Sequence, residues 1–205
     1  SLDTVRMSER FLVHSRTAAT LAKSEADPLL HPRIDVLKFA FRDVTAVPYV
    51  GRDAVISMGI VAPPKQSLKV IEAFLSVAPH FPNTVFAVVG HIAMDPALQR
   101  DIRQRIAELG LQARVVLPGR VSAMEYDSWL ARGKLAVQLR DLSKGESSAA
   151  IADCLSYGVP VVASDVGAAR ELPSKAISLV PREIPSEELA GVVTRMLNDP
   201  EMLYP

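Results

Sequence analysis

Short runs of apolar residues alternate with amphipathic segments along most of the chain. Several runs are nearly continuous and rich in Val, as is typical of parallel strands covered on both faces. Alternation of strands and helices favours right-handed βαβ crossovers, so the pattern predicts an α/β fold with an open parallel sheet. The predicted strands are Phe11–Val13, Ile34–Phe39, Ala54–Met58, Val85–Val89, Arg114–Leu117, Leu135–Leu139, Pro160–Ala163 and Ile177–Val180.

Helix signals fill the segments between these strands. Apolar residues in 66–77 recur at the spacing of one helix face. A second predicted helix has Asp95 as its cap, Pro96 in its first turn and Gly110 after its last turn. A final helix is expected to begin near Ser186, a good N-cap residue.

The first part of the chain fits this alternation less well. Residues 1–41 contain one strand, one helix and a possible second strand, and the irregular stretch 42–52 is typical of a linker. The core domain is therefore expected to span 53–205. On this pattern alone the front piece is either an appendage or the tail of a missing domain.

Composition excludes several classes of protein. Lys plus Arg and Asp plus Glu are both 23, so the formal net charge is zero, which argues against a nucleic-acid binder. One cysteine, Cys154, and four scattered His residues argue against a metal enzyme. Neither Gly-x-Gly-x-x-Gly nor a P-loop occurs. No apolar run approaches the roughly 18 residues of a membrane span, so we expect a cytoplasmic protein, with no membrane association visible in this sequence.

The most informative segment spans 138–171. A strand is expected to end near Leu139, a polar loop follows, and a helix is expected to start at Ser147 and Ser148. Free N–H groups and the positive end of the dipole make such a helix start suitable for an anion such as a diphosphate. The alternative is that Ser147 only caps the helix.

Two acidic residues in this segment are candidate ligands. Asp153 is the single charge among small and apolar positions of the helix, and its carboxylate could accept hydrogen bonds from the hydroxyls of a ribose. The alternative is a structural Asp. Glu146 lies seven residues earlier and would share nearly the same face if the helix were extended. Alone, Glu146 is a first-turn acid that favours the helix dipole.

The run 157–167, which reads YGVPVVASDVG, is followed by Ala168 and Glu171. This pattern resembles the C-terminal nucleotide-sugar-binding domain of GT-B fold glycosyltransferases of the group 1 (family 4) class. The resemblance extends over roughly 53–200 and implies a Rossmann-like parallel sheet with helices on both faces.

The resemblance also implies roles for the acidic residues. Asp153 falls where the family places the Glu that binds the donor ribose. Gly145 falls where the family places its first Glu, and Glu146 stands one position later. Glu146 is therefore the candidate catalytic residue beside the donor sugar.

A second matching segment, 57–65, implies the phosphate contacts. Lys65 matches the family's Lys that contacts the donor diphosphate, where a flexible point charge is useful. Ile60 replaces the family's Arg, so we expect Arg140 or Lys144 to supply the missing charge. Ser147 and Ser148 complete the expected diphosphate site.

Two further segments complete the comparison. The loop of Gly119, Arg120 and Val121 corresponds to one that lies near the nucleotide base in the family. Residues 11–15 are similar to the last strand of the family's N-terminal domain. The chain would then consist of the tail of a missing N-terminal domain with a linker (1–52) and a donor-binding domain (53–205).

The resemblance implies a retaining, metal-independent glycosyltransferase of hexosyl or related type that needs no cofactor. Its substrate would be a UDP-, GDP- or ADP-sugar, and its partner the N-terminal acceptor domain of the same protein. The fragment alone is expected to be inactive. The alternative is a non-catalytic nucleotide-sugar-binding or scaffold domain, because Ile60, Gly145 and Asp153 depart from the family pattern. A third interpretation is a regulatory α/β domain of the flavodoxin type.

Overall fold

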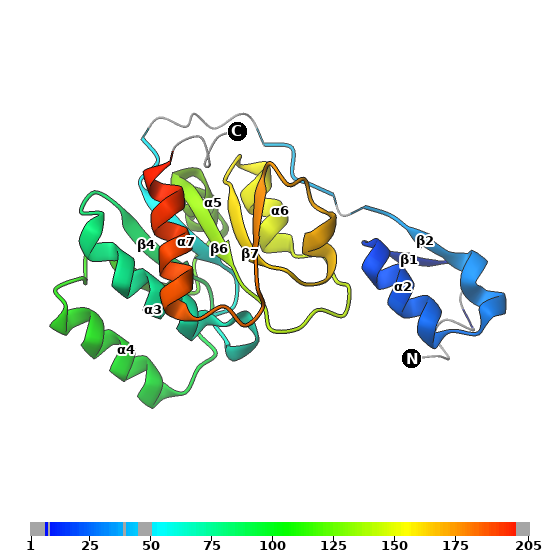
Figure 1. Ribbon diagram of the computed structural model, residues 1–205, viewed down its shortest axis with the longest axis horizontal. Helices are drawn as coiled ribbons and strands as arrows, with labels where there is room; N and C mark the ends of the chain where they lie inside the picture. The colour runs from blue at the N-terminus through cyan, green and yellow to red at the C-terminus, as the bar shows by residue number, and fades with distance from the viewer. Residues whose placement is uncertain (1–6, 8, 39, 45–50, 200–205) are drawn as a thin grey trace.

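A computed structural model describes residue 7 and residues 9–38, 40–44 and 51–199 of the chain. Within these residues the strands form two sheets, in which every pair of neighbouring strands is parallel (Figure 1). The larger sheet has six strands in the order β5-β4-β3-β6-β7-β8. Its strands are β3 (Ala54–Met58), β4 (Val85–Val89), β5 (Val115–Gly119), β6 (Gly133–Gln138), β7 (Val161–Ser164) and β8 (Ile177–Val180).

Helices connect the strands of this sheet. They are α3 (Ser67–Val77), α4 (Pro96–Glu108), α5 (Ala123–Arg132), α6 (Ala149–Ser156) and α7 (Ser186–Asn198), with short 3-10 helices η2 (Pro63–Lys65), η3 (Ala78–His80) and η4 (Gly167–Glu171). The strand order runs outward in opposite directions from the neighbours β3 and β6. Open sheets of this kind bind ligands beyond the carboxyl ends of the strands at such a reversal.

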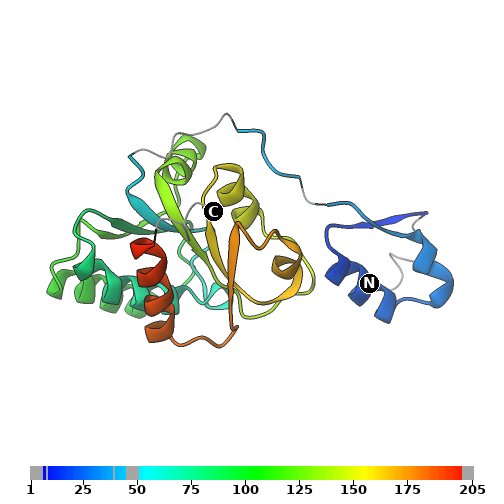
Figure 2. The same cartoon turned by 45° about the horizontal axis from the view of Figure 1, so that its top comes forward.

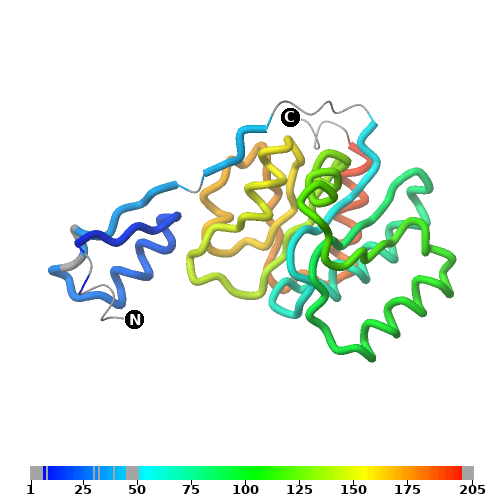
Figure 3. Tube along the Cα trace, turned by 180° about the vertical axis from the view of Figure 1, so that it is seen from behind, coloured from blue at the N-terminus to red at the C-terminus, as the bar shows by residue number. Residues whose placement is uncertain are grey.

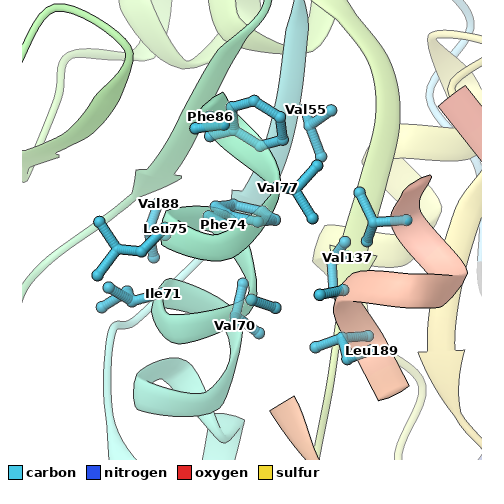
Figure 4. Packing of buried hydrophobic residues seen from close by; sticks show 14 of the residues in the cluster. Val55, Val70, Ile71, Phe74, Leu75, Val77, Phe86, Val88, Val137 and Leu189 are labelled. Atoms are coloured by element: carbon cyan, nitrogen blue, oxygen red, sulfur yellow. The ribbon is translucent and has the colours of Figure 1, made fainter. Parts of the chain in front are cut away.

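The helices cover both faces of the sheet. On one face, α3, α4 and α7 pack over a cluster that includes Phe74, Phe86 and Leu189 (Figure 4). The rings of Phe74 and Phe86 lie 5.3 Å apart between centroids, tilted by 56°, which is a favourable aromatic arrangement. On the other face, α5 and α6 bury Leu130 and Ile151 against the sheet. The predicted Rossmann-like sheet with two covered faces is confirmed.

The first described residues form a separate small unit, which we call the front unit. It consists of β1 (Phe11–Val13), α2 (Arg16–Glu25), η1 (Pro28–Arg33) and β2 (Ile34–Val36), and β1 pairs with β2 alone among the described strands. Figures 1, 2 and 3 place it at one end of the molecule, beyond the side of the large sheet where α6 and β7 lie. The helix α2 contacts η4.

Residues 42–44, interpreted as part of a linker, lie against the large domain. The Arg42 guanidinium donates to both carboxylate oxygens of Asp127 in α5, at 2.7 and 3.0 Å. The backbone N–H of Arg42 donates to the Ser156 hydroxyl at the end of α6, at 3.0 Å. This part of the connection is therefore anchored to both helices. Residues 45–50 lie outside the described residues.

Most predicted elements are found, with small shifts at their ends. The strands β1, β3, β4 and β8 have the predicted limits, whereas β2 ends at Val36 and the predicted Phe39 is not among the described residues. The prediction that Ser186 caps the last helix is wrong. Pro185 occupies the N-cap position with extended backbone (φ −64°, ψ 155°), no side chain caps the helix, and Ser186 is already helical.

None of the helices among the described residues is long and apolar enough to cross a membrane. The described residues also hold no group of three or more His, Cys, Asp or Glu side chains arranged to bind a metal ion.

Candidate functional site

A cavity of about 270 Å³ lies at the carboxyl ends of β6 and β7, between the start of α6, η4 and the front unit. Five of the predicted site residues line the cavity from the domain of the six-stranded sheet: Lys65, Arg140, Glu146, Ser147 and Ser148. The front unit and the residues after β2 contribute His14, Ser15, Lys38 and Phe41. The cavity therefore stands where ligands of open α/β sheets bind, and it has walls from both parts of the chain.

The two serines at the start of α6 have different partners. The Ser148 hydroxyl accepts a hydrogen bond from the Ile151 N–H at 3.4 Å, so Ser148 is the N-cap. The Ser147 hydroxyl donates to the His14 carbonyl at 3.2 Å. The alternative reading, in which Ser147 caps the helix, is therefore wrong, and Ser147 instead joins the loop to the front unit.

Arg140 and Glu146 form an ion pair within the loop that follows β6. The Arg140 backbone N–H donates to the Ser164 hydroxyl at 2.9 Å, and its guanidinium donates to Glu146 Oε1. Glu146 Oε2 accepts from the Lys144 N–H at 2.6 Å and weakly from the Ser143 hydroxyl at 3.4 Å. The carboxylate is thus held from both sides. Lys144, the alternative to Arg140, contributes its backbone N–H here and does not line the cavity.

Lys65 lies beside this ion pair. The Asp141 N–H donates to the Pro64 carbonyl at 3.0 Å, which fixes the Lys65 turn against the loop. Burial lowers the pKa of Lys65, the Arg140 charge lowers it further, and the Glu146 charge raises it. The Lys65 ammonium makes no hydrogen bond or ion pair with the rest of the described chain. Glu146 therefore pairs with Arg140 and leaves the Lys65 charge without an ion-pair partner among the described residues, which is an arrangement that attracts an additional anion.

Hydrogen bonds keep Glu146 ionised. Burial alone would raise the pKa of Glu146, but the backbone N–H groups of Glu146 and Lys144, with the Arg140 charge, hold this pKa below its ordinary value. A carboxylate in this state accepts hydrogen bonds and cannot donate a proton near neutral pH.

Gly145, at the position of the family's first Glu, has no room for a side chain. Its φ is +87°, and a Cβ there would lie 2.4 Å from the Cα of Ala18 in α2. The Gly145 carbonyl accepts a hydrogen bond from the Ser15 hydroxyl at 2.5 Å. The front unit thus occupies the space that a Glu side chain would need. Glu146, one position later, lines the cavity instead.

The cavity does not include the predicted ribose and base contacts. Asp153 lies on the side of α6 that faces α5, where the Tyr126 hydroxyl donates to its Oδ2 at 3.1 Å. Burial and the Asp153 charge raise the pKa of Tyr126, which keeps this hydroxyl protonated as a donor. Residues 119–121 are likewise absent from the lining. Because α6 begins only at Ala149, Glu146 and Asp153 do not share a helix face, as an extended helix would have placed them.

The lining side chains that are not among the predicted site residues include Lys38, Phe41 and Glu171. Lys38 and Phe41 follow β2, and Glu171 ends η4. Glu171 carries a sequence signal, because it matches the last acidic position of the resemblance. Lys38 and Phe41 carry none, since they reach the cavity only through the docking of the front unit.

The strand order and the covered faces of the sheet define a Rossmann-like α/β domain of the kind found as the C-terminal domain of GT-B glycosyltransferases. The fold is similar to the C-terminal domain of a glycosyl transferase group 1 family protein (LpcC) from Francisella tularensis, at 20% identity over 75% of this chain and 80% of that one, with a TM-score of 0.65. Residues 46–203 match the model of the family described as glycosyl transferases group 1, and the chain belongs to this family.

Other solved structures show the same fold at low identity. Anabaena Alr3699/HepE in complex with UDP and glucose is 18% identical over 98% of this chain and 56% of that one, with a TM-score of 0.73. Sucrose-phosphate synthase from Thermosynechococcus elongatus is 20% identical over 94% of this chain and 50% of that one, with a TM-score of 0.69. The chain thus spans about half the length of these two proteins. Comparison with curated proteins finds no match.

Proposed function

We propose that the chain is the donor-binding half of a glycosyltransferase that uses a nucleotide-sugar. The observation that carries this proposal is the pairing of Lys65 and Arg140 in one cavity at the start of α6. Two cations and a helix N-terminus together suit the diphosphate of such a donor. Membership of the group 1 family and the UDP in the HepE complex support the same ligand class.

In this proposal the cavity stabilises the leaving diphosphate. Lys65 and Arg140 neutralise the charge that develops when the bond to the sugar breaks, and fixed charges of this kind are the largest contribution such a site can make. Because side chains supply the positive charge, we propose a metal-independent reaction, with retention of configuration at a hexosyl or related sugar. The donor to test first is UDP-glucose, with GDP- and ADP-sugars as the alternatives.

The acceptor would come from an N-terminal domain of the same protein. Among the described residues, the sheet of the front unit has only two strands, β1 and β2, and its buried apolar core is limited to Val13, Ala19 and Ile34. Leu12 and Leu37 are 57% and 56% exposed on it, so it presents apolar surface that such a domain would cover. We propose that residues 1–205 alone bind the donor without transferring its sugar, since no acceptor is held within reacting distance.

Calorimetry with UDP, GDP and ADP tests the proposal directly. Lys65→Ala should weaken binding of the preferred nucleoside diphosphate about tenfold or more and leave the nucleoside unaffected, because the ammonium acts on phosphates. Lys23→Ala, at the exposed end of α2, is the control and should bind as the wild type does. Failure of the wild type to bind any nucleoside diphosphate would contradict the proposal.

A second candidate function is nucleotide-sugar binding without catalysis. It is favoured by Ile60, which replaces the family's Arg and is 47% exposed, and by Gly145, which has no carboxylate. A product assay on the full-length protein separates the two candidates. Transfer that Glu146→Ala reduces supports the enzyme, whereas donor binding with no transfer by the wild type supports the binding protein.

A further inference from the structure

The guanidinium that the proposed donor diphosphate requires is already engaged by a carboxylate of the same loop. Arg140 donates to Glu146, and the Arg140 side chain is only 19% exposed whereas that of Glu146 is 49% exposed. The nearby Lys65 ammonium makes no hydrogen bond or ion pair within the described chain. A diphosphate entering the cavity therefore meets one available cation and one that is occupied.

We propose that Glu146 occupies the Arg140 guanidinium in the free protein and that the donor diphosphate replaces Glu146 there when it binds. In the free protein Glu146 neutralises Arg140. When the diphosphate binds, the guanidinium moves from the carboxylate to the phosphate oxygens, and Glu146 is released to accept hydrogen bonds from the donor sugar. This inference rests on the proposed function and adds the order in which the site is assembled.

The geometry favours exchange of the guanidinium with little movement of the loop. The Arg140 backbone is fixed to Ser164, so only its side chain has to turn. Glu146 keeps its hydrogen bonds from the Lys144 N–H and the Ser143 hydroxyl after Arg140 leaves. Its carboxylate is therefore not left without a partner, which would otherwise oppose the exchange.

The charges favour the same direction. A diphosphate carries more than one negative charge and offers paired oxygens that match the planar fork of a guanidinium. Glu146 offers a single charge. The exchange also removes the mutual repulsion of Lys65 and Arg140, because the diphosphate lies between both cations and neutralises them together.

The test is whether one substitution strengthens or weakens the binding of inorganic pyrophosphate and UDP. Glu146→Gln removes the competing charge and is expected to tighten both ligands roughly threefold to tenfold. Glu183→Gln breaks another exposed Arg–Glu pair, with Arg182, and is the control, expected to bind as the wild type does. Glu146→Gln should strengthen the binding of UDP-glucose less than that of UDP, because the variant lacks the carboxylate that would accept hydrogen bonds from the sugar.

A double-mutant cycle shows whether the gain passes through Arg140. Arg140→Ala should weaken the binding of pyrophosphate. In the Arg140→Ala background, Glu146→Gln should increase the affinity for pyrophosphate clearly less than it does in the wild type. Equal or weaker binding of pyrophosphate by Glu146→Gln, with the wild type binding it, overturns the exchange and leaves the proposed function intact. Equal gains in both backgrounds also overturn it. Absence of UDP and pyrophosphate binding in the wild type overturns both proposals.

Discussion

Glu171 holds the start of α2 through Thr17. The Glu171 carboxylate accepts from the Thr17 N–H at 2.8 Å, from the Thr17 hydroxyl at 2.9 Å and from the Arg16 N–H at 2.9 Å. These N–H groups belong to the first turn of α2, where no helical partner exists. A side chain of the large domain thus satisfies the helix of the front unit, and it does so at the edge of the cavity.

Replacing Glu171 should loosen the front unit. Glu171→Gln removes the charge that faces the α2 dipole, which is typically worth about 1 kcal/mol at a helix start. Hydrogen exchange at the amides of Arg16 and Thr17 should become several times faster, while amides in the core of the large sheet stay unchanged. Glu183→Gln is the control for loss of an exposed carboxylate. Unchanged exchange at both amides would show that Glu171 does not hold α2.

Docking of the front unit should also weaken in acid. Burial alone would raise the pKa of Glu171, but the N–H groups of Arg16 and Thr17 hold this pKa below the ordinary 4.5. A carboxylate with a lowered pKa stabilises the docked state fully above its ordinary pKa, and this contribution is lost as the pH falls through the lowered value. The same exchange measurement across this range should follow that sign in the wild type and be flat in Glu171→Gln.

Gly145 provides a steric test of the same contact. Gly145→Ala carries the cost of a left-handed backbone, about 1–2 kcal/mol, and also a clash with Ala18. Gly51→Ala is the matched control, because Gly51 has a similar φ of +93° with nothing within 4 Å of its Cβ position. Small-angle scattering should show a more extended particle for Gly145→Ala only. Identical scattering and stability of the two variants would contradict the close approach of α2.

The sequence predicts the sheet well because its strands are buried on both faces. A continuous apolar run marks β4 from end to end, and in β3 only Ser57 interrupts such a run. It fails at β2, where the apolar run continues past Val36 but the strand ends there. The partner strand β1 ends at Val13, and the Leu37 N–H, just after β2, still donates to the Val13 carbonyl at 2.8 Å. Strand length here is set by pairing, which apolar periodicity does not record.

The sequence predicts the site residues that follow strands of the large sheet. It misses the residues that reach the cavity only because the front unit docks there. Lys65 and Arg140 both follow strands of the large sheet, so their approach follows from the topology. Lys38 and Phe41 meet the cavity through the placement of the front unit. That placement relies on single contacts between distant residues, such as Ser15 with Gly145, and such contacts leave no local pattern.

Asp153 is expected to contribute to nucleoside binding only. Asp153 lies outside the lining of the cavity, so this contact requires a ribose that extends beyond it. Tyr126 donates to Oδ2 of Asp153, and none of the described residues donates to Oδ1, which leaves that oxygen as an acceptor for a ribose hydroxyl. Asp153→Asn should weaken UDP by about 1–3 kcal/mol, the usual effect of losing a charged acceptor. Binding of pyrophosphate, which has no ribose, should not change. Calorimetry with both ligands checks this, and equal UDP affinity in the variant would make Asp153 structural.

Lys65 should take up a proton when UDP binds in alkaline solution. Burial, and then the Arg140 charge, lower the pKa of Lys65 from the ordinary 10.5, so its ammonium begins to lose its proton at a lower pH than an ordinary lysine does. A bound diphosphate favours the charged form and raises this pKa again, whereas the phosphates, with a second pKa of about 6, are already ionised. Calorimetry about one pH unit below the ordinary lysine value, in buffers of different ionisation enthalpy, should therefore show net proton uptake that fades toward neutral pH. Lys65→Arg keeps the positive charge at every accessible pH and should bind UDP without proton uptake. Uptake that persists in Lys65→Arg, or none in the wild type, would mean that the Lys65 ammonium does not face the diphosphate.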